Sequence, residues 1–214
     1  MKTNLVVSGM TIKFLLSCGI IAGILTIITD LVAGLVKPGY NFLSQSASEL
    51  SAVGMPTRAV VVPLTLISGM CMLAFSTGMW LTATHNILFR IIALILILSA
   101  LFSTIALLFF PLHSGEVMRS PANRLNVVIM FIGVFAFFLA ICVGIIANTG
   151  WFRFFSAGLI LLFVLLTIFG AIMSKSKLEI FGEHSQQVGI QERTMIYTWN
   201  LWLALQALVL LIKQ

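Results

Sequence analysis

FRIIALILILSALFSTIALLFF, residues 89–110, contains one charged side chain, Arg90, and no proline or glycine. A helix that crosses the roughly 30 Å hydrocarbon core of a bilayer needs about 20 predominantly apolar residues. Backbone polar groups in lipid must be satisfied within the segment, so a run of this length is expected to be helical. The stretch therefore predicts a transmembrane helix.

The whole chain has the same character. Of its 214 residues, 60% are hydrophobic and 8% are charged, and the mean hydropathy is +1.15. A soluble domain has about 25% charged residues, so the composition excludes a soluble enzyme, a DNA-binding domain, a secreted disulfide scaffold and a disordered chain. The net charge of +6 comes from basic residues scattered around the apolar runs rather than clustered on one face, so no nucleic-acid partner is expected.

Six runs meet the length criterion, and together they predict an all-α polytopic membrane protein with six transmembrane helices. The whole chain, 1–214, then forms a single six-helix transmembrane domain with no separate soluble domain. The predicted spans are residues 11–36, 59–84, 89–110, 125–149, 155–173 and 194–212.

The predicted connections differ in length, which divides the two sides of the membrane. Loops 37–58, 111–124 and 174–193 are long, whereas 85–88 and 150–154 are short. Because consecutive spans alternate in direction, the three longer loops are expected on one side, where they can form a polar surface.

Basic residues in loops favour the cytoplasmic side. The short-loop side has five basic residues and no acid, and the long-loop side has seven basic residues with five glutamates. The first helix usually dominates orientation, and Lys2 and Lys13 precede it while Lys37 follows it. We expect both termini in the cytoplasm.

Two motifs resemble a known family. The first long loop reads KPGYNFLSQSASEL, residues 37–50, and the last span begins with GIQER, residues 189–193, followed by YTWNLW at 197–202. With a Phe-Pro pair at the end of the third span, this pattern resembles the domain-of-unknown-function 998 (DUF998) family. The resemblance implies a six-span prokaryotic membrane protein, hence the cytoplasmic (inner) membrane of a cell, and it implies no reaction. Relatives are expected to have an acidic residue after the Phe-Pro, where this chain has Leu112 and His113.

Asp30 is the only acidic residue inside a predicted span. A carboxylate there is costly and marks a functional site by default. The structural alternatives are that it is protonated, that it hydrogen-bonds a neighbouring helix, or that it pairs with Arg124 or Arg193.

Ser48 and Glu49 form the centre of the first motif. In a catalytic interpretation Ser48 is a nucleophile and Glu49 a general base or metal ligand. In a structural one, Ser46 to Glu49 is a capping box that begins a short amphipathic helix at the interface.

His113 completes the catalytic candidates. A serine hydrolase would combine Ser48, His113 and Asp30, but no Gly-x-Ser-x-Gly elbow is present. A zinc site would combine His113 with His184 and Glu49 or Glu183, without a metal-ligand spacing to support it. We therefore expect no metal and no cofactor.

Polar residues near the start of the last span complete the candidate binding site. Glu192 is expected in the first helical turn, and Arg193 either extends to lipid headgroups or binds a phosphate, Asp30 or Glu49. Asn200 lies deeper and is expected to bond across helices. The candidate binding residues are Asp30, Glu49, Arg124, Glu192, Arg193 and Asn200.

Three functions remain open at this point, and whether the chain is an enzyme is undecided. One is a protein that binds or translocates a lipid or small hydrophobic solute at a polar pocket under the long loops. The alternatives are an intramembrane hydrolase acting on a lipid-like substrate and a structural subunit of a membrane complex. The expected partners are membrane lipids, with a homo-oligomer or a second membrane subunit in addition. A small-xxx-small pair, Gly19 and Gly23, suits packing within the bundle or dimerisation.

Overall fold

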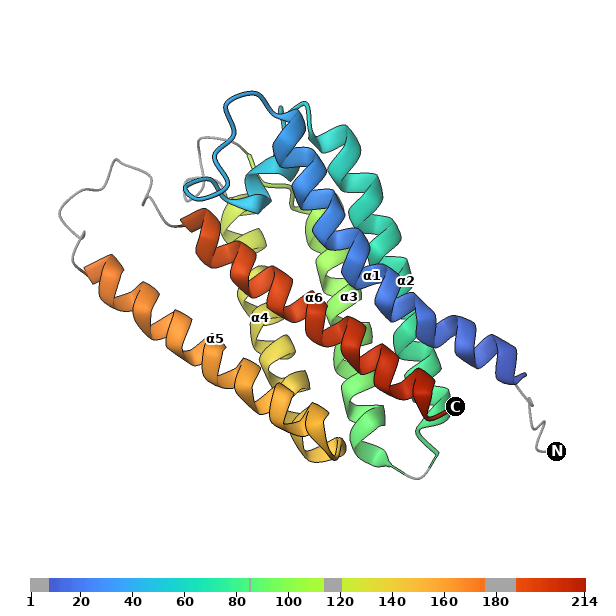
Figure 1. Ribbon diagram of the computed structural model, residues 1–214. Helices are drawn as coiled ribbons and strands as arrows, with labels where there is room; N and C mark the ends of the chain where they lie inside the picture. The colour runs from blue at the N-terminus through green and yellow to red at the C-terminus, as the bar shows by residue number, and fades with distance from the viewer. Residues whose placement is uncertain (1–7, 85, 114–120, 176–187) are drawn as a thin grey trace.

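The computed structural model describes residues 8–84, 86–113, 121–175 and 188–214, and these form an antiparallel helical bundle (Figure 1). Its helices are α1 (Gly9–Val36), the short 3-10 helix η1 (Ala47–Ser51), α2 (Arg58–Thr82), α3 (Ile87–Phe109), α4 (Pro121–Ala147), α5 (Trp151–Lys175) and α6 (Val188–Ile212).

This architecture confirms an all-α polytopic membrane protein. Five of the helices are long and apolar enough to cross a bilayer, and in α5 the apolar stretch Trp151–Leu165 is shorter. The described residues include no strand, only an isolated bridge between Val53 and His113. Many large apolar side chains are on the outside, among them Leu35 and Phe131 (77% and 71% exposed), as expected where lipid replaces water.

The helix boundaries agree with the predicted spans to within a few residues, except at the start of α6. This helix begins at Val188 rather than at residue 194. Glu192 and Arg193 therefore lie inside the helix, in its second turn, and not at its opening. The polar sequence suggested a loop, but contacts with the first long loop hold this segment as helix.

The first long loop and the start of α6 lie together at one end of the bundle, as Figure 1 shows. The start of α1 and the end of α6 lie at the other end. Between them, a core of fully buried side chains fills the bundle, including Leu16, Phe75, Ile92, Leu96 and Trp202.

The small-xxx-small pair lets α1 approach α6 closely. A Cβ on Gly19 would lie 2.8 Å from the Cβ of Ala207, and one on Gly23 would lie 2.7 Å from the carbonyl oxygen of Asn200. Both distances are shorter than a side chain tolerates. The pair therefore serves packing within the chain, and its second interpretation, dimerisation, gains no support.

Candidate functional site

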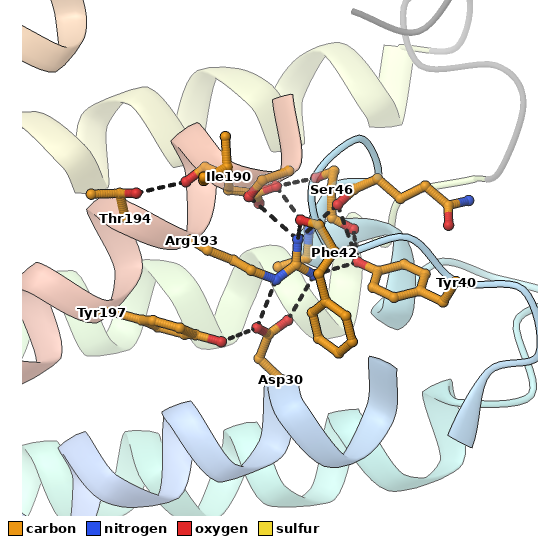
Figure 2. Close-up of polar contacts among 12 residues, drawn as sticks. Asp30, Tyr40, Phe42, Ser46, Ile190, Arg193, Thr194 and Tyr197 are labelled. Carbon is orange, nitrogen blue, oxygen red and sulfur yellow. Dashed lines mark hydrogen bonds and ion pairs between the residues drawn. The ribbon is translucent and has the colours of Figure 1, made fainter. Parts of the chain in front are cut away.

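A buried ion pair joins α1 to α6 below the first long loop (Figure 2). Nε of Arg193 donates to Oδ2 of Asp30 at 2.9 Å, and Nη2 donates to Oδ1 at 3.1 Å. Asp30 is 8% exposed and Arg193 is 5% exposed. Of the two arginines that the sequence offered as partners for Asp30, the structure selects Arg193, in a bidentate geometry that is specific to a guanidinium.

The remaining donors of Arg193 bind the first long loop. Nη1 donates to the loop carbonyls of Phe42 (2.7 Å) and Gln45 (2.8 Å), and Nη2 also donates to the hydroxyl of Tyr40. Nη1 also donates to the Gly189 carbonyl of its own helix at 3.3 Å. A guanidinium has five N–H groups, and protein atoms use all three of its nitrogens. Arg193 thus fastens the loop to two helices and has no donor left for a lipid phosphate.

Two tyrosines complete the surroundings of the pair. Tyr197, one turn further along α6, donates to Oδ2 of Asp30 at 2.5 Å. Tyr40 donates to the carbonyl of Ser46 at 2.7 Å, and its ring lies 5.3 Å from the guanidinium carbon of Arg193. Burial raises the pKa of the Tyr40 phenol, so its hydroxyl remains a proton donor at neutral pH.

Glu192 caps the 3-10 helix from across the chain. Its Oε2 accepts from the hydroxyl of Ser46 and from the backbone N–H of Ala47 (2.9 Å), and Oε1 accepts from the N–H of Ser48 (3.3 Å). Ser46 is the N-cap of η1, as the predicted capping box has it, and the carboxylate of the cap comes from Glu192, which binds the N–H groups of the first turn. The expected box had Glu49 in that role, but Glu49 makes no side-chain hydrogen bond or ion pair with the described residues.

Gly189 lets the start of α6 touch the loop. A Cβ at this position would lie 2.4 to 2.9 Å from the carbonyl oxygens of Gln45, Phe42 and Leu43. The N–H of Ile190 donates to the Leu43 carbonyl at 3.1 Å. The two motifs 37–50 and 189–193 are thus two halves of one assembly. We call its charged part the loop-end cluster, formed by Asp30, Tyr40, Ser46, Glu192, Arg193 and Tyr197.

A cavity of about 220 Å³ lies beside this cluster. Asp30, Ser48 and Glu192 are among its lining residues, so three of the predicted candidates converge there. The full lining comes from four long helices and η1: Thr26, Thr29, Asp30, Ala47, Ser48, Leu50, Ser51, Val61, Thr65, Leu107, Glu192 and Ile196.

The other predicted site residues do not line the cavity. Glu49 is half-buried on η1, and Arg124 is exposed near the start of α4. His113 pairs with Val53 in the isolated bridge. Asn200 is buried, and its amide donates to the Ile196 carbonyl of its own helix at 2.8 Å rather than across helices. Arg193 adjoins the cavity through Asp30.

The groups expected for catalysis are not assembled around Ser48. Its hydroxyl lies 2.5 Å from that of Ser46, which donates to Glu192. Neither Glu49 nor His113 bonds to Ser48. Glu192 accepts its three hydrogen bonds from the Ser46 hydroxyl and two backbone N–H groups, and none from the Ser48 hydroxyl. Within the described ranges no three His, Cys, Asp or Glu side chains could hold a metal ion, and His184 and Glu183 of the proposed zinc site lie outside them.

The sequence pattern did not identify several residues of this site. Tyr40 and Gly189 stood in the quoted motifs but were given no role, and Tyr197, in the second motif, was expected only as an aromatic near a span end. Ser46 was expected at the start of the capping box, and it is the N-cap of η1. The spacing of Arg193 and Tyr197, one helical turn apart, was the available signal that both face the same neighbour.

A family model described as "Protein of unknown function (DUF998)" matches residues 20–209. No curated protein and no solved structure matches the chain.

Proposed function

The chain belongs to the DUF998 family, and we propose that it binds a lipid or small hydrophobic solute whose polar head group occupies the cavity beside the loop-end cluster. The observation that carries this proposal is the mixed polar and apolar lining of the cavity. Hydroxyl and carboxylate groups come from α1, η1, α2 and α6, and the apolar side chains include Leu50, Val61, Leu107 and Ile196.

The size of the cavity supports a head group rather than a whole lipid. Pockets for complete small ligands measure about 300–1,000 Å³, and this one measures about 220 Å³. An amphiphile can place its polar end here while its chain extends among the apolar side chains and into the bilayer.

The position of the cavity supports binding as the primary activity. It lies at the long-loop end, and the packed core with Leu16, Phe75 and Leu96 separates it from the opposite end. Translocation would require that core to open. The hydrolase and structural-subunit alternatives have no specific observation in their favour.

The test fills the cavity and measures bound amphiphile. Leu107 lines the cavity, whereas the next residue, Leu108, is 48% exposed on the lipid-facing surface. Leu107→Trp should reduce the amount of co-purifying lipid, measured by native mass spectrometry of the protein released from nanodiscs. Leu108→Trp adds the same side chain outside the cavity and should retain the wild-type amount.

Equal lipid retention in both variants, with both folded, would overturn the proposal. If Leu107→Trp does not fold, Ile196→Phe, at another lining residue, replaces it. Reconstituted vesicles with a fluorescent lipid then separate the two modes: a carrier moves the lipid between leaflets, and a binding protein does not.

A further inference from the structure

We infer that the cavity selects a cationic head group, specifically a primary ammonium. This inference rests on the proposed function and names the ligand class. It follows from the polar lining groups, which are two carboxylates and five hydroxyls, and all of these hydroxyls except that of Thr65 already bond to protein atoms.

Four of the five lining hydroxyls, those of Thr26, Thr29, Ser48 and Ser51, bond to protein atoms, and only that of Thr65, which is exposed, makes no hydrogen bond with the described residues. Thr29 donates to the Leu25 carbonyl at 2.7 Å, and Ser51 donates to the Ser48 carbonyl at 2.9 Å. The Ser46 hydroxyl donates to Glu192, so in the short contact between the Ser46 and Ser48 hydroxyls the donor is Ser48. The oxygens of Thr29, Ser48 and Ser51 therefore keep unused lone pairs and have no proton to offer.

Both lining carboxylates also keep acceptor capacity. Oδ2 of Asp30 accepts from Arg193 and Tyr197, while Oδ1 accepts one bond, from Arg193. Oε2 of Glu192 accepts two bonds, while Oε1 accepts a single long one at 3.3 Å. One oxygen of each carboxylate can therefore accept a further donor.

No lining residue offsets this charge. The two carboxylates face one neighbouring cation, Arg193, and its nitrogens are all occupied. Two other basic residues lie in this part of the chain, and neither lines the cavity. Arg58 donates to the Ser51 carbonyl, and the Lys37 ammonium lies 5.1 Å from the centre of the Tyr40 ring. Asp30, Glu192 and Arg193 together carry a net charge of −1, which favours a cation and opposes a carboxylate or phosphate.

An ammonium fits this lining better than a metal ion does. The described residues contain no metal-ligand group, and the cavity is far larger than a single ion. A primary ammonium offers three donors to the carboxylate and hydroxyl oxygens, and its alkyl chain can contact Leu107 and Ile196.

The experiment compares amphiphiles that differ only in the head group. Octylamine, 1-octanol and octanoate are titrated against the protein in nanodiscs, and binding is read from the shift in melting temperature. Octylamine should bind at least about tenfold more tightly than octanol, and octanoate should bind most weakly of the three. Ethylamine, which keeps the ammonium but lacks the long chain, separates a lipid-like ligand from a free amine: weak binding indicates the former.

A matched pair of variants locates the effect. Thr29→Val removes a lining oxygen at nearly constant volume, whereas Thr104→Val removes a hydroxyl that bonds to the Ala100 carbonyl in the same way but lies outside the cavity. Octylamine affinity should fall about fivefold in the first and stay unchanged in the second. Ser51→Ala serves as the second lining variant if Thr29→Val fails to fold.

The outcomes separate the two claims. Octanol or octanoate binding as tightly as octylamine, sensitive to Leu107→Trp, would overturn the ammonium inference and leave the binding proposal standing. Octylamine binding that Thr29→Val and Ser51→Ala both leave unchanged would also overturn it. Failure of all three amphiphiles to bind would overturn the proposed function and this inference together.

Discussion

Two of the buried polar contacts between helices, one toward each end of the bundle, are built differently. At the loop end, Asp30 and Arg193 are charged and need Tyr40, Tyr197 and the loop carbonyls to satisfy them. At the opposite end, Asn148 donates to Gln206 at 2.8 Å and to the Gly144 carbonyl at 2.9 Å, and both side chains are at most 1% exposed.

The two contacts differ in the number of chain segments that they need. The amide pair is neutral, and two helices suffice to satisfy it. Near it, the Trp202 side chain donates a further interhelical hydrogen bond to the Ser156 hydroxyl at 3.0 Å. The charged pair recruits a whole loop and adjoins a cavity. Neutral polar contacts in membranes typically contribute about 0.6 kcal/mol, whereas a buried charge that loses its partner costs several times more.

Removal of the guanidinium should have the largest effect on stability. Arg193→Ala leaves Asp30 as an unpaired buried charge and releases the loop, so it should lower the free energy of unfolding by about 3–5 kcal/mol. Reversible unfolding in mixed micelles measures the loss. The double variant Asp30→Leu/Arg193→Met should recover part of it, and the part not recovered measures the anchoring of the loop. A loss below about 1 kcal/mol would contradict the contrast with the amide pair.

The two glutamates near η1 provide the next test. Glu192→Ala removes three hydrogen bonds to a charged group, each bond of this kind contributing about 1.5–3 kcal/mol, and should cost at least the value of one. Glu49→Ala removes no bond and should stay within about 0.5 kcal/mol of wild type. The same unfolding assay measures both losses of stability. Equal losses in the two variants would mean that Glu49 contributes to the cap, as the sequence predicted.

Gly189→Ala tests the close contact between α6 and the loop. The added methyl group meets three carbonyl oxygens, and overpacking of this kind costs about 1–3 kcal/mol. Amide hydrogen exchange of residues 40–51 should also increase. Gly133→Ala is the control, because a Cβ there meets nothing within 4 Å; similar losses in both variants would point to the helix backbone instead.

Replacement of the amide pair should have the smallest effect. Gln206→Leu should cost about 0.6 kcal/mol, with about 1.7 kcal/mol as the upper bound for such bonds. Asn148→Leu/Gln206→Leu should regain most of this loss, since neither amide is then left without a partner. A cost comparable to that of Arg193→Ala would remove the distinction between the two ends.

The sequence was informative where a local pattern determines structure. Apolar runs such as 89–110 predicted every helix, because bilayer thickness and backbone hydrogen bonding leave little choice. Asp30 was identified because a carboxylate within a span is rare, and Arg193 was one of its two expected partners.

The remainder depends on contacts between distant segments. Glu49 sat at the correct spacing for a capping box, yet Glu192, on another helix, provides the carboxylate. Tyr197 and Asn148 carry no charge, so nothing in their local sequence distinguishes a buried partner from an interfacial side chain. The start of α6 was placed six residues late (194 against 188), because its polar residues bond to a loop that the local pattern does not reveal.

The sequence separation within the ion pair has a consequence for the synthesis of the protein. Arg193 follows Asp30 by 163 residues, so α1 enters the membrane long before its counter-charge has been translated. Until then Asp30 lacks its guanidinium partner, and an isolated carboxylate is costly in lipid. Arrival of α6 supplies the partner and buries the carboxylate, and the same event fixes the first loop and caps η1. A chain truncated before α6 therefore lacks the partner of Asp30, the anchor of the first loop and the carboxylate that caps η1.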